Sequence, residues 1–182
     1  MDEHLIETTC SSEKVFSGRV FEVEVKKVQL PDGHFSTREI VNHNGGACIL
    51  PIDDEMNAYV VKQFRSPFER VLLEVPAGKL EKGELPIDCA IRELLEETGF
   101  VSGNVVDLGC EIASPGYDSE VIYLFAARDL HYDGQKLDDG EFLDVVKMPL
   151  KDLIAMADNG EIKDGKSLIC IYKAVRKLNL NV

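Results

Sequence analysis

GKLEKGELPIDCAIRELLEETGF, residues Gly78–Phe100, is the most informative segment of this 182-residue chain. Pro86 suits the first turn of a helix, and Gly99 stands where a helix would end. Between them, apolar residues recur at the spacing of one helix face. These apolar positions are Ile87, Ala90, Ile91, Leu94 and Leu95. The spacing predicts an amphipathic helix that buries this apolar stripe.

Three glutamates crowd the last turn of the predicted helix. At about 100° per residue, Glu93 and Glu97 lie about 40° apart beside the apolar stripe, and Glu96 lies nearer to solvent. Like charges at this spacing and near a helix C-terminus are destabilising, and Arg92 offsets only part of the repulsion. Clustered carboxylates are the ligands that a hard cation such as Mg²⁺ prefers. The pattern therefore indicates a metal site, with a solvated glutamate-rich helix face as the alternative.

The pattern in this segment is longer than the glutamate cluster. It fills every fixed position of the Nudix box, G-x5-E-x7-R-E-U-x-E-E-x-G-U, where U is a bulky apolar residue. The residues are Gly78, Glu84, Arg92, Glu93, Leu94, Glu96, Glu97, Gly99 and Phe100. Average residue frequencies put a chance match on the order of 10⁻⁹ per starting position. The chain thus resembles the Nudix hydrolases.

Length and composition predict one well-buried domain with a small appendage. The net charge of −13 argues against nucleic acid and against an anionic membrane surface as partners. The five cysteines are scattered and form no C-x-x-C pair, which is typical of reduced core residues in an intracellular protein. The start of the chain is acidic, and no apolar run approaches about 18 residues. We therefore expect a soluble, cytoplasmic protein.

The N-terminal region contains a predicted hairpin. Residues Val20–Val28 alternate apolar and polar side chains, residues 31–33 form a turn, and Phe35–Val41 return as a second strand. Residues 1–12 have weak patterning and are expected to be a loosely held terminus. A lone hairpin cannot bury its face, so it must pack on the main body or on another subunit.

The remaining segments predict a mixed sheet with helices on its faces, an α/β fold. Expected strands are Ala47–Ile52, Ala58–Phe64, Val71–Val75, Val105–Ile112, Glu120–Ala127 and Phe142–Met148; expected helices are Leu150–Asp158 and Ser167–Leu178, with a mobile loop at Asp129–Gly140. The resemblance implies the Nudix α/β/α sandwich around a mixed β-sheet for residues 46–182. Residues 1–45 would be an antiparallel β extension that serves dimerisation and the substrate site.

The resemblance also implies a metal site on the box helix. In similar enzymes the carbonyl of the residue before the box glycine binds the metal, which here is Ala77. Glu93 and Glu97 would be the main side-chain ligands and Glu96 a further one, with Mg²⁺ as the cofactor and Mn²⁺ as the alternative. Arg92 would orient the glutamates. Glu84 suits a structural role as well as a catalytic one.

A general base in this family often comes from an acidic loop after the box. Lys136–Val145, KLDDGEFLDV, supplies Asp138, Asp139 and Glu141. Glu141 is the preferred candidate because it directly precedes a predicted strand, and Glu120 is the second choice. A solvated acidic loop is the alternative.

Segments outside the box are similar to the ADP-ribose pyrophosphatase subgroup. They are LLEVPAGKLEKGE at Leu72–Glu84, REIV at Arg38–Val41, QFR at Gln63–Arg65, and the proline of ASPGYDSE at Ala113–Glu120. The substrate-binding residues implied are Arg38, Gln63, Arg65, Glu74, Pro115 and Gly116. Arg65 follows an apolar strand that ends near the box, where a guanidinium could clamp a phosphate bidentately; a surface arginine is the alternative. Four aromatic residues could stack on an adenine, although each is individually more typical of a core: Phe35, Phe64, Phe68 and Tyr117.

Together these features predict a Mg²⁺-dependent hydrolase that cleaves the pyrophosphate of ADP-ribose or a related ADP-sugar, giving AMP and ribose 5-phosphate, by attack of a metal-activated water. The enzymes it resembles are homodimers whose N-terminal strands reach the partner subunit. Another nucleoside diphosphate-linked substrate is an open alternative: a different nucleotide sugar, NADH or a dinucleoside polyphosphate. A non-catalytic nucleotide sensor is less favoured, because such proteins usually lose box glutamates and none is missing here.

Overall fold

The computed structural model describes residues 2–180 of the chain. These residues divide into two compact units. The first unit comprises Met1–Gly45 with Ile112–Val121, and the second comprises Gly46–Glu111 with Ile122–Val182. Over the described part of the chain, no helix has the length and apolar character needed to cross a membrane.

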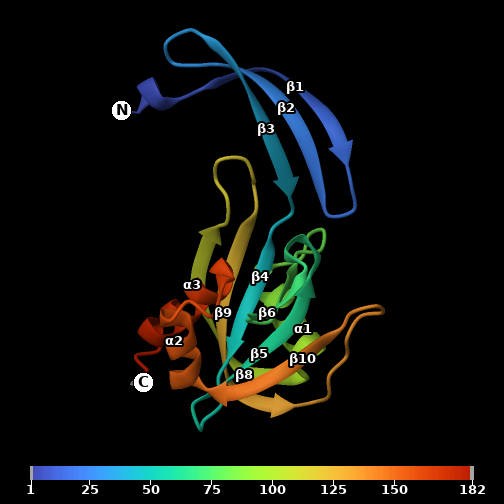
Figure 1. The fold of residues 1–182 in the computed structure, drawn as a ribbon, viewed down its shortest axis with the longest axis vertical. Helices are drawn as coiled ribbons and strands as arrows, with labels where there is room; N and C mark the ends of the chain where they lie inside the picture. Colours follow the sequence, from blue (N-terminus) through green and yellow to red (C-terminus); the bar gives the residue numbers. More distant parts are fainter. Residues whose placement is uncertain (1, 181–182) are drawn as a thin grey trace. The chain divides into compact units, whose positions relative to one another are not determined.

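The first unit is built on a three-stranded antiparallel sheet in the order β1-β2-β3, which Figure 1 shows in blue. Its elements are η1 (Glu3–Leu5), β1 (Thr8–Ser17), β2 (Phe21–Gln29) and β3 (Phe35–His43). The predicted hairpin is confirmed, and its turn places Gly33 at φ +89°, which glycine adopts without strain. The expected loose terminus is wrong from Thr8 onward. All of β1 is exposed, so it carries no alternating burial pattern, and its strand conformation comes from pairing with β2.

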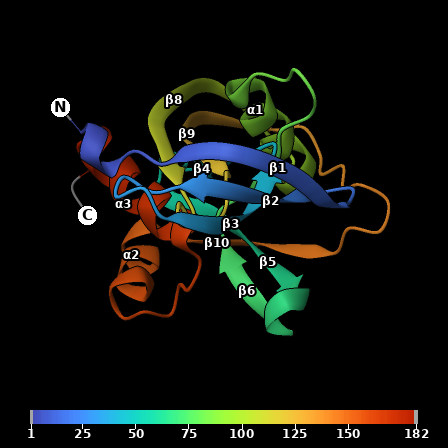
Figure 2. The ribbon, with the colours of Figure 1, turned by 90° about the horizontal axis from the view of Figure 1, so that it is seen from above.

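The second unit contains two sheets. One is mixed, in the order β7-β4-β9-β8, with β4 parallel to β9 and antiparallel to β7; the other is antiparallel, in the order β10-β5-β6. Figure 2 shows β6 beside β5 at the free edge of its sheet. The strands are β4 (Gly46–Pro51), β5 (Asn57–Arg65), β6 (Arg70–Glu74), β7 (Ala77–Lys79), β8 (Phe100–Ile112), β9 (Val121–Tyr132) and β10 (Leu143–Pro149), with the short helix η2 (Ser66–Phe68) before β6.

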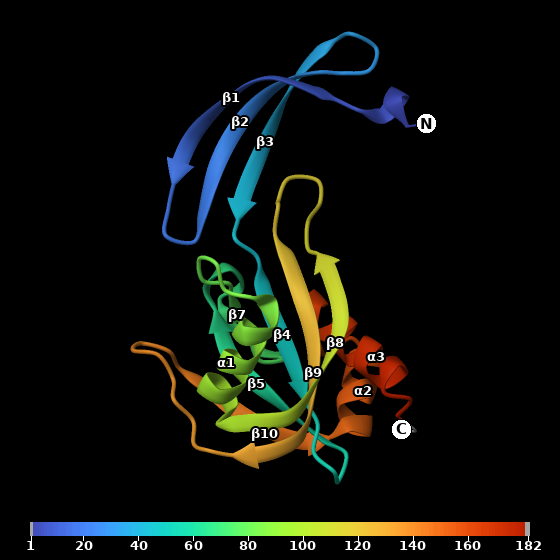
Figure 3. The same ribbon diagram turned by 180° about the vertical axis from the view of Figure 1, so that it is seen from behind.

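Helices cover both faces of the mixed sheet. Because side chains alternate along a strand, β4 sends Ala47 and Ile49 to one cluster and Cys48 and Leu50 to the other. The first cluster packs against α1 (Pro86–Thr98), and the second packs against α2 (Leu150–Asp158) and α3 (Gly165–Lys177). Figure 3 shows α1 and α3 on opposite sides of β4 and β9. The predicted α/β/α sandwich is therefore present.

Several boundaries differ from the predicted ones. β8 begins at Phe100 rather than Val105, immediately after the helix stop, and β9 continues to Tyr132 into the expected loop. Hydrogen bonds tie the two strands at this end, since Ser102 Oγ donates to the Arg128 carbonyl at 2.6 Å. Helix α2 has the predicted bounds.

The cysteines are only partly core residues. Cys48, Cys89 and Cys170 are buried as expected, whereas Cys10 and Cys110 are exposed. All five are free thiols.

Candidate active site

Helix α1 starts and stops where its sequence predicts. Pro86 is its first residue, where its missing N–H leaves no hydrogen bond unmade. At the other end, Gly99 takes the left-handed conformation at φ +76° and donates its N–H to the Leu95 carbonyl at 2.9 Å. The helix therefore ends at Thr98, one residue after Glu97, and β8 begins directly after the cap residue Gly99.

The buried face of α1 differs from the predicted one. Ala90 and Leu94 are fully buried, but Ile87 and Ile91 are about two-fifths exposed, at 39% and 40%. Glu93 and Glu97, expected beside the apolar stripe, are instead buried, with 8% and 2% exposure. The helix is rotated so that these two carboxylates, and not the isoleucines, face the protein.

Both buried glutamates lie against β7. Glu97 Oε2 accepts a hydrogen bond from the Ala77 backbone N–H at 3.1 Å. The Glu93 carboxylate lies against Gly78, where an added Cβ would stand 1.6 Å from Glu93 Oε1. The box glycine is thus required by the close approach of a carboxylate to the backbone.

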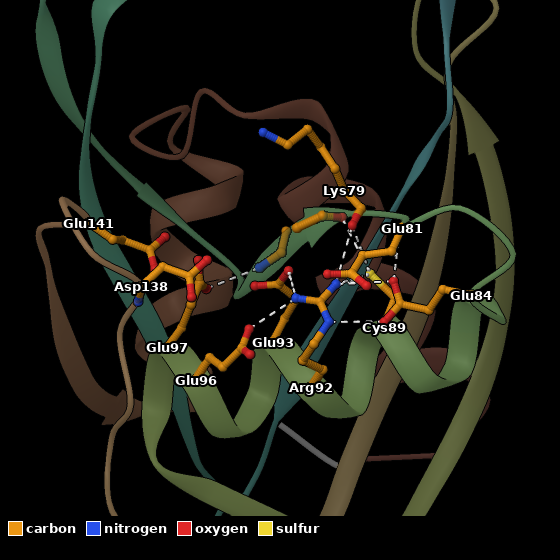
Figure 4. A network of polar contacts seen from close by, with 12 residues as sticks. Lys79, Glu81, Glu84, Cys89, Arg92, Glu93, Glu96, Glu97, Asp138 and Glu141 are labelled. Atoms are coloured by element: carbon orange, nitrogen blue, oxygen red, sulfur yellow. Dashed lines mark hydrogen bonds and ion pairs between the residues drawn. The ribbon is translucent and has the colours of Figure 1, made fainter. Parts of the chain in front are cut away.

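Arg92 binds every glutamate at a fixed position of the box except Glu97, as Figure 4 shows. Its Nε and Nη2 donate to both oxygens of Glu84 at 2.9 and 3.1 Å. Its Nη1 donates to Glu93 at 2.6 Å and to Glu96 at 3.0 Å. Glu84 also accepts the Glu81 N–H at 2.9 Å, which fixes the loop before the helix. In this structure Glu84 supports Arg92, and Arg92 fixes the position of two box glutamates.

Burial raises the pKa of both inward glutamates. For Glu97, desolvation is the main cause and the charge of Glu93 the next, and together they raise the pKa to about 8. For Glu93, burial raises the pKa against the opposing hydrogen bond from Arg92. Among residues 2–180, no cationic side chain forms an ion pair with Glu97. A site that keeps two buried carboxylates close together is suited to a cation.

The donor set fits a hard divalent cation in its chemistry. Glu93 and Glu97 offer carboxylate oxygens, and the hydrogen bond between Ala77 and Glu97 brings the backbone of β7 to the same place. The side chains of the described residues do not form a preassembled cluster of three or more metal-binding groups. Glu96 is turned to Arg92 instead. Two carboxylates leave most of an octahedron to waters, backbone and substrate oxygens, which is typical of Mg²⁺.

The acidic loop brings Glu141 to this site. Figure 4 shows Glu141 and Asp138 beside Glu97, and the charge of Glu141 raises the pKa of both Glu97 and Glu93. Glu141 is held by its N–H bond to the Asp138 carbonyl at 3.0 Å and by Gln63 Nε2 at 3.5 Å. The strand begins at Leu143, so the expected start at Phe142 is one residue early.

Arg65 is near the glutamates but has a partner that the sequence did not indicate. Its Nε and Nη2 donate to the two oxygens of Glu74 at 2.7 and 2.8 Å. Glu74 is 2% exposed and also accepts from Lys166 Nζ. This bidentate edge of Arg65 is therefore occupied by a carboxylate and not open to a phosphate. The charge of Glu97 raises the pKa of Arg65 as a further effect after Glu74, so the guanidinium lies within electrostatic range of the buried Glu97.

Other residues expected at the substrate site belong to the first unit. Arg38 donates to Glu7, to Ser36 Oγ at 3.0 Å and to the Thr37 carbonyl at 2.9 Å. Pro115 and Gly116 are exposed. Glu120, the second choice for a base, lies 3.2 Å from His43 Nδ1. The part of Arg38, Pro115 and Gly116 in substrate binding, and of Glu120 as a base, stays a prediction.

The four aromatic residues considered for stacking are not core residues. Phe35, Phe64, Phe68 and Tyr117 are all more than half exposed, at 61%, 56%, 62% and 57%. The expectation that each belongs to a core is wrong. Lys27 lies over the Phe35 ring and Arg70 over the Phe68 ring, but all four rings keep exposed surface for a ligand or another protein surface.

Comparisons with known proteins assign both the family and the fold. Residues 42–168 match the NUDIX domain family. The chain is 40% identical to the ADP-ribose pyrophosphatase of Bacillus subtilis over 92% of its length and 91% of that protein. It is 39% identical to the methanol dehydrogenase activator of Bacillus methanolicus over 91% of its length and 90% of that protein. A solved structure described as an ADP compounds hydrolase has the same fold, with a TM-score of 0.83 and 21% identity, covering 95% of this chain and 94% of that one.

These matches establish the class of the protein, which belongs to the Nudix family. Its box runs from Gly78 on β7 to Phe100 at the start of β8, and α1 carries the two buried glutamates that lie against the backbone of β7.

Proposed function

We propose that this Nudix hydrolase cleaves the pyrophosphate of ADP-ribose or a related ADP-sugar, releasing AMP and the sugar phosphate, which is ribose 5-phosphate when the substrate is ADP-ribose. The observation that carries the proposal is the pair of buried glutamates, Glu93 and Glu97, packed against β7. The identity with the B. subtilis relative, named an ADP-ribose pyrophosphatase, supports the substrate. The complete set of box glutamates supports an enzyme over a non-catalytic sensor.

Glu93, Glu97 and the Ala77 carbonyl would hold Mg²⁺, with Mn²⁺ as a substitute and Glu96 as a further ligand. When bound, the cation neutralises phosphate charge and lowers the pKa of a water nucleophile. Arg92 keeps Glu93 and Glu96 together, and Glu84 keeps Arg92 in place. Release of Glu96 from Arg92 would let it join the metal site.

Glu141 is the proposed general base. It lies beside Glu97 on a loop held by Asp138 and Gln63, so it can accept a proton from a water at this end of the helix. Gln63 keeps its carboxylate oriented. Arg65 would bind a phosphate oxygen through the N–H groups that Glu74 leaves open, because no described protein group accepts from Nη1.

We also propose a homodimer in which residues 1–45 form an N-terminal dimerisation unit and residues 46–182 the hydrolase domain. Of the described side chains in β1, β2 and β3, only Val28 is buried. A sheet this exposed needs a further covering surface. Its apolar side chains Val15, Phe16, Phe21 and Phe35 are 40% to 61% exposed, which favours a second copy of this chain as the cover. We expect the dimer to reside in the cytoplasm.

A substrate panel tests the activity. Purified protein with Mg²⁺ is offered ADP-ribose, other ADP-sugars, GDP-mannose, NADH and a dinucleoside polyphosphate, and products are separated by chromatography. We expect the highest kcat/KM with an ADP-sugar and a product ratio of one AMP per sugar phosphate. Preference for NADH or a dinucleoside polyphosphate would favour the alternative substrates, and binding without turnover would favour the sensor.

A further inference from the structure

The first turn of α3 contacts two parts of the candidate site: the Glu74 carboxylate that binds Arg65, and the backbone that leads to Ala77. Asp164 is the N-cap of this helix, and its Oδ2 accepts the Ser167 N–H at 2.9 Å. Lys166 and Ser167, in the same turn, each reach across to the end of β6. These contacts join residues more than ninety positions apart in sequence, and no motif in the sequence indicated them.

Lys166 contacts the carboxylate that holds Arg65. Its Nζ donates to Glu74 Oε2 and to Asp164 Oδ2, the latter at 2.9 Å. The Lys166 side chain is 11% exposed and that of Glu74 is 2% exposed. The cluster of Arg65, Glu74, Lys166 and Asp164 has two positive and two negative groups, so its charges balance. Balanced, well hydrogen-bonded charges are what burial at this depth requires.

Ser167 contacts the backbone that leads to β7. Its Oγ, in a residue with 1% exposure, accepts the Val75 N–H at 2.9 Å and donates to Asp164. The next residues are held as well, because the Pro76 carbonyl accepts the Ile49 N–H at 2.9 Å and the Ala77 N–H donates to Glu97. The segment that carries Ala77 is therefore fixed from α3 on one side and from α1 on the other.

We propose that the first turn of α3 is a positioning element for the active site. Lys166 acts through Glu74 to hold the guanidinium of Arg65, and Ser167 acts through Val75 to hold the backbone at Ala77. Neither residue touches the reacting atoms. The proposal rests on the proposed function for the roles of Arg65 and Ala77. Its first arm, the role of Lys166, is measured by KM, and its second arm, the role of Ser167, is measured by Mn²⁺ affinity.

The first arm is tested by Lys166→Met, which keeps the length of the side chain and removes the charge. We expect KM for ADP-ribose to rise by about 10-fold, the effect of weakening one charged contact, with kcat changed much less. Lys166→Arg should recover most of this KM. If Lys166→Met folds poorly, the double variant Lys166→Met/Asp164→Asn restores the charge balance and keeps an N-cap, so the same rise in KM can be measured.

The second arm is tested by Ser167→Ala and needs no turnover. Mn²⁺ binding, followed by electron paramagnetic resonance without substrate, should weaken by about 10-fold, as for other residues that support metal ligands. The KM of this variant at saturating metal should stay near the wild-type value.

Lys173→Met is the matched control. Lys173 is on the same helix and donates to the Leu108 carbonyl at 2.8 Å, away from the site residues. It should lower Tm without changing KM or the Kd for Mn²⁺. The proposal is overturned if Lys166→Met and Ser167→Ala behave like this control. A failure of the proposed function is seen separately, as a wild-type protein that does not hydrolyse ADP-ribose; the metal-binding arm can still be measured on it.

Discussion

Glu97 lies against Ala77, with its Oε2 accepting the Ala77 N–H at 3.1 Å. A carboxylate with 2% exposure and a pKa raised by burial is costly for a helix to keep. This contact places the Glu97 carboxylate beside the backbone of β7, where the buried carboxylate of Glu93 also lies. We interpret the pair as retained for metal binding.

Gly78→Ala should inactivate the protein. The added Cβ would stand 1.6 Å from Glu93 Oε1 and 2.1 Å from its Cδ, so the carboxylate must leave its place. We expect kcat with Mg²⁺ to fall by at least about 100-fold, as when a metal ligand or its support is displaced. Lys173→Met is the control, because Lys173 donates to the Leu108 carbonyl at 2.8 Å, away from the site residues. Activity of Gly78→Ala near that of the control would mean that Glu93 works from another position.

Arg65→Ala should raise KM for ADP-ribose more than it lowers kcat. Loss of a charged hydrogen bond costs about 1.5–3 kcal/mol, roughly 10- to 100-fold in KM. Arg70→Ala is the matched control, since Arg70 pairs with Arg65 across β5 and β6 and is exposed. Steady-state kinetics of both variants measure the effect on KM and kcat, and melting curves measure the effect on Tm. An unchanged KM with a lowered Tm would leave Arg65 as a structural partner of Glu74 only.

Deletion of residues 1–41 should abolish both dimerisation and turnover. The exposed apolar side chains of β1 to β3 are the proposed contact surface. Phe16→Glu, at a position with 51% exposure, is the milder variant and should shift the protein towards monomer. Light scattering gives the mass and an ADP-ribose assay gives the activity. A monomeric truncation with full activity would refute this role for the N-terminal unit.

The raised pKa of Glu97 predicts how metal-free stability changes with pH. The folded pKa of about 8 exceeds the ordinary value of 4.5, so the folded state binds more protons between these values. The contribution of protonated Glu97 to the free energy of unfolding is complete below about pH 4.5 and is lost as the pH rises through about 8. Glu97→Gln removes this dependence. The Tm of Glu97→Gln minus that of the wild type should therefore increase from pH 6 to pH 9, each kcal/mol giving about 2–4 °C. A difference that is flat or decreasing would contradict a pKa raised in the folded protein.

The stability contributed by Glu74 changes in the opposite direction and in a lower pH range. Burial raises its pKa, but Arg65 and Lys166 outweigh this and bring the pKa to about 2. That stability is present above the ordinary value of 4.5 and is lost as the pH falls towards 2. The two groups can therefore be distinguished in one pH series of melting curves.

The sequence predicted the elements that have strong local signals. Pro86 and Gly99 bound α1, and the apolar run at residues 47–52 became the buried strand β4. β1 could not be predicted in this way, because all of its residues are exposed and its pairing with β2 is the cause of its conformation.

The sequence identified most of the residues of the candidate site but not the contacts that these residues make. The box spacing identified the glutamates, but the apolar stripe suggested that Ile87 and Ile91 are buried, where the structure buries Glu93 and Glu97. The reason is that the carboxylates of Glu93 and Glu97 occupy the inner face of α1, which leaves Ile87 and Ile91 partly exposed. The pairing of Arg65 with Glu74 and Lys166 joins β5, β6 and α3, and no local pattern encodes such a contact.

The most direct test of the account is the shift in Tm that Mg²⁺ produces in wild-type protein and in Glu97→Gln at pH 7.5. The substitution keeps side-chain volume and helix propensity nearly unchanged while it removes a charged oxygen ligand. We predict that metal-free Glu97→Gln melts at or slightly above the wild-type temperature, that Mg²⁺ stabilises it much less, and that turnover of ADP-ribose falls by orders of magnitude. A variant that melts many degrees lower without metal, or that keeps the wild-type Mg²⁺ shift and activity, would contradict the assignment of Glu97 as a metal ligand.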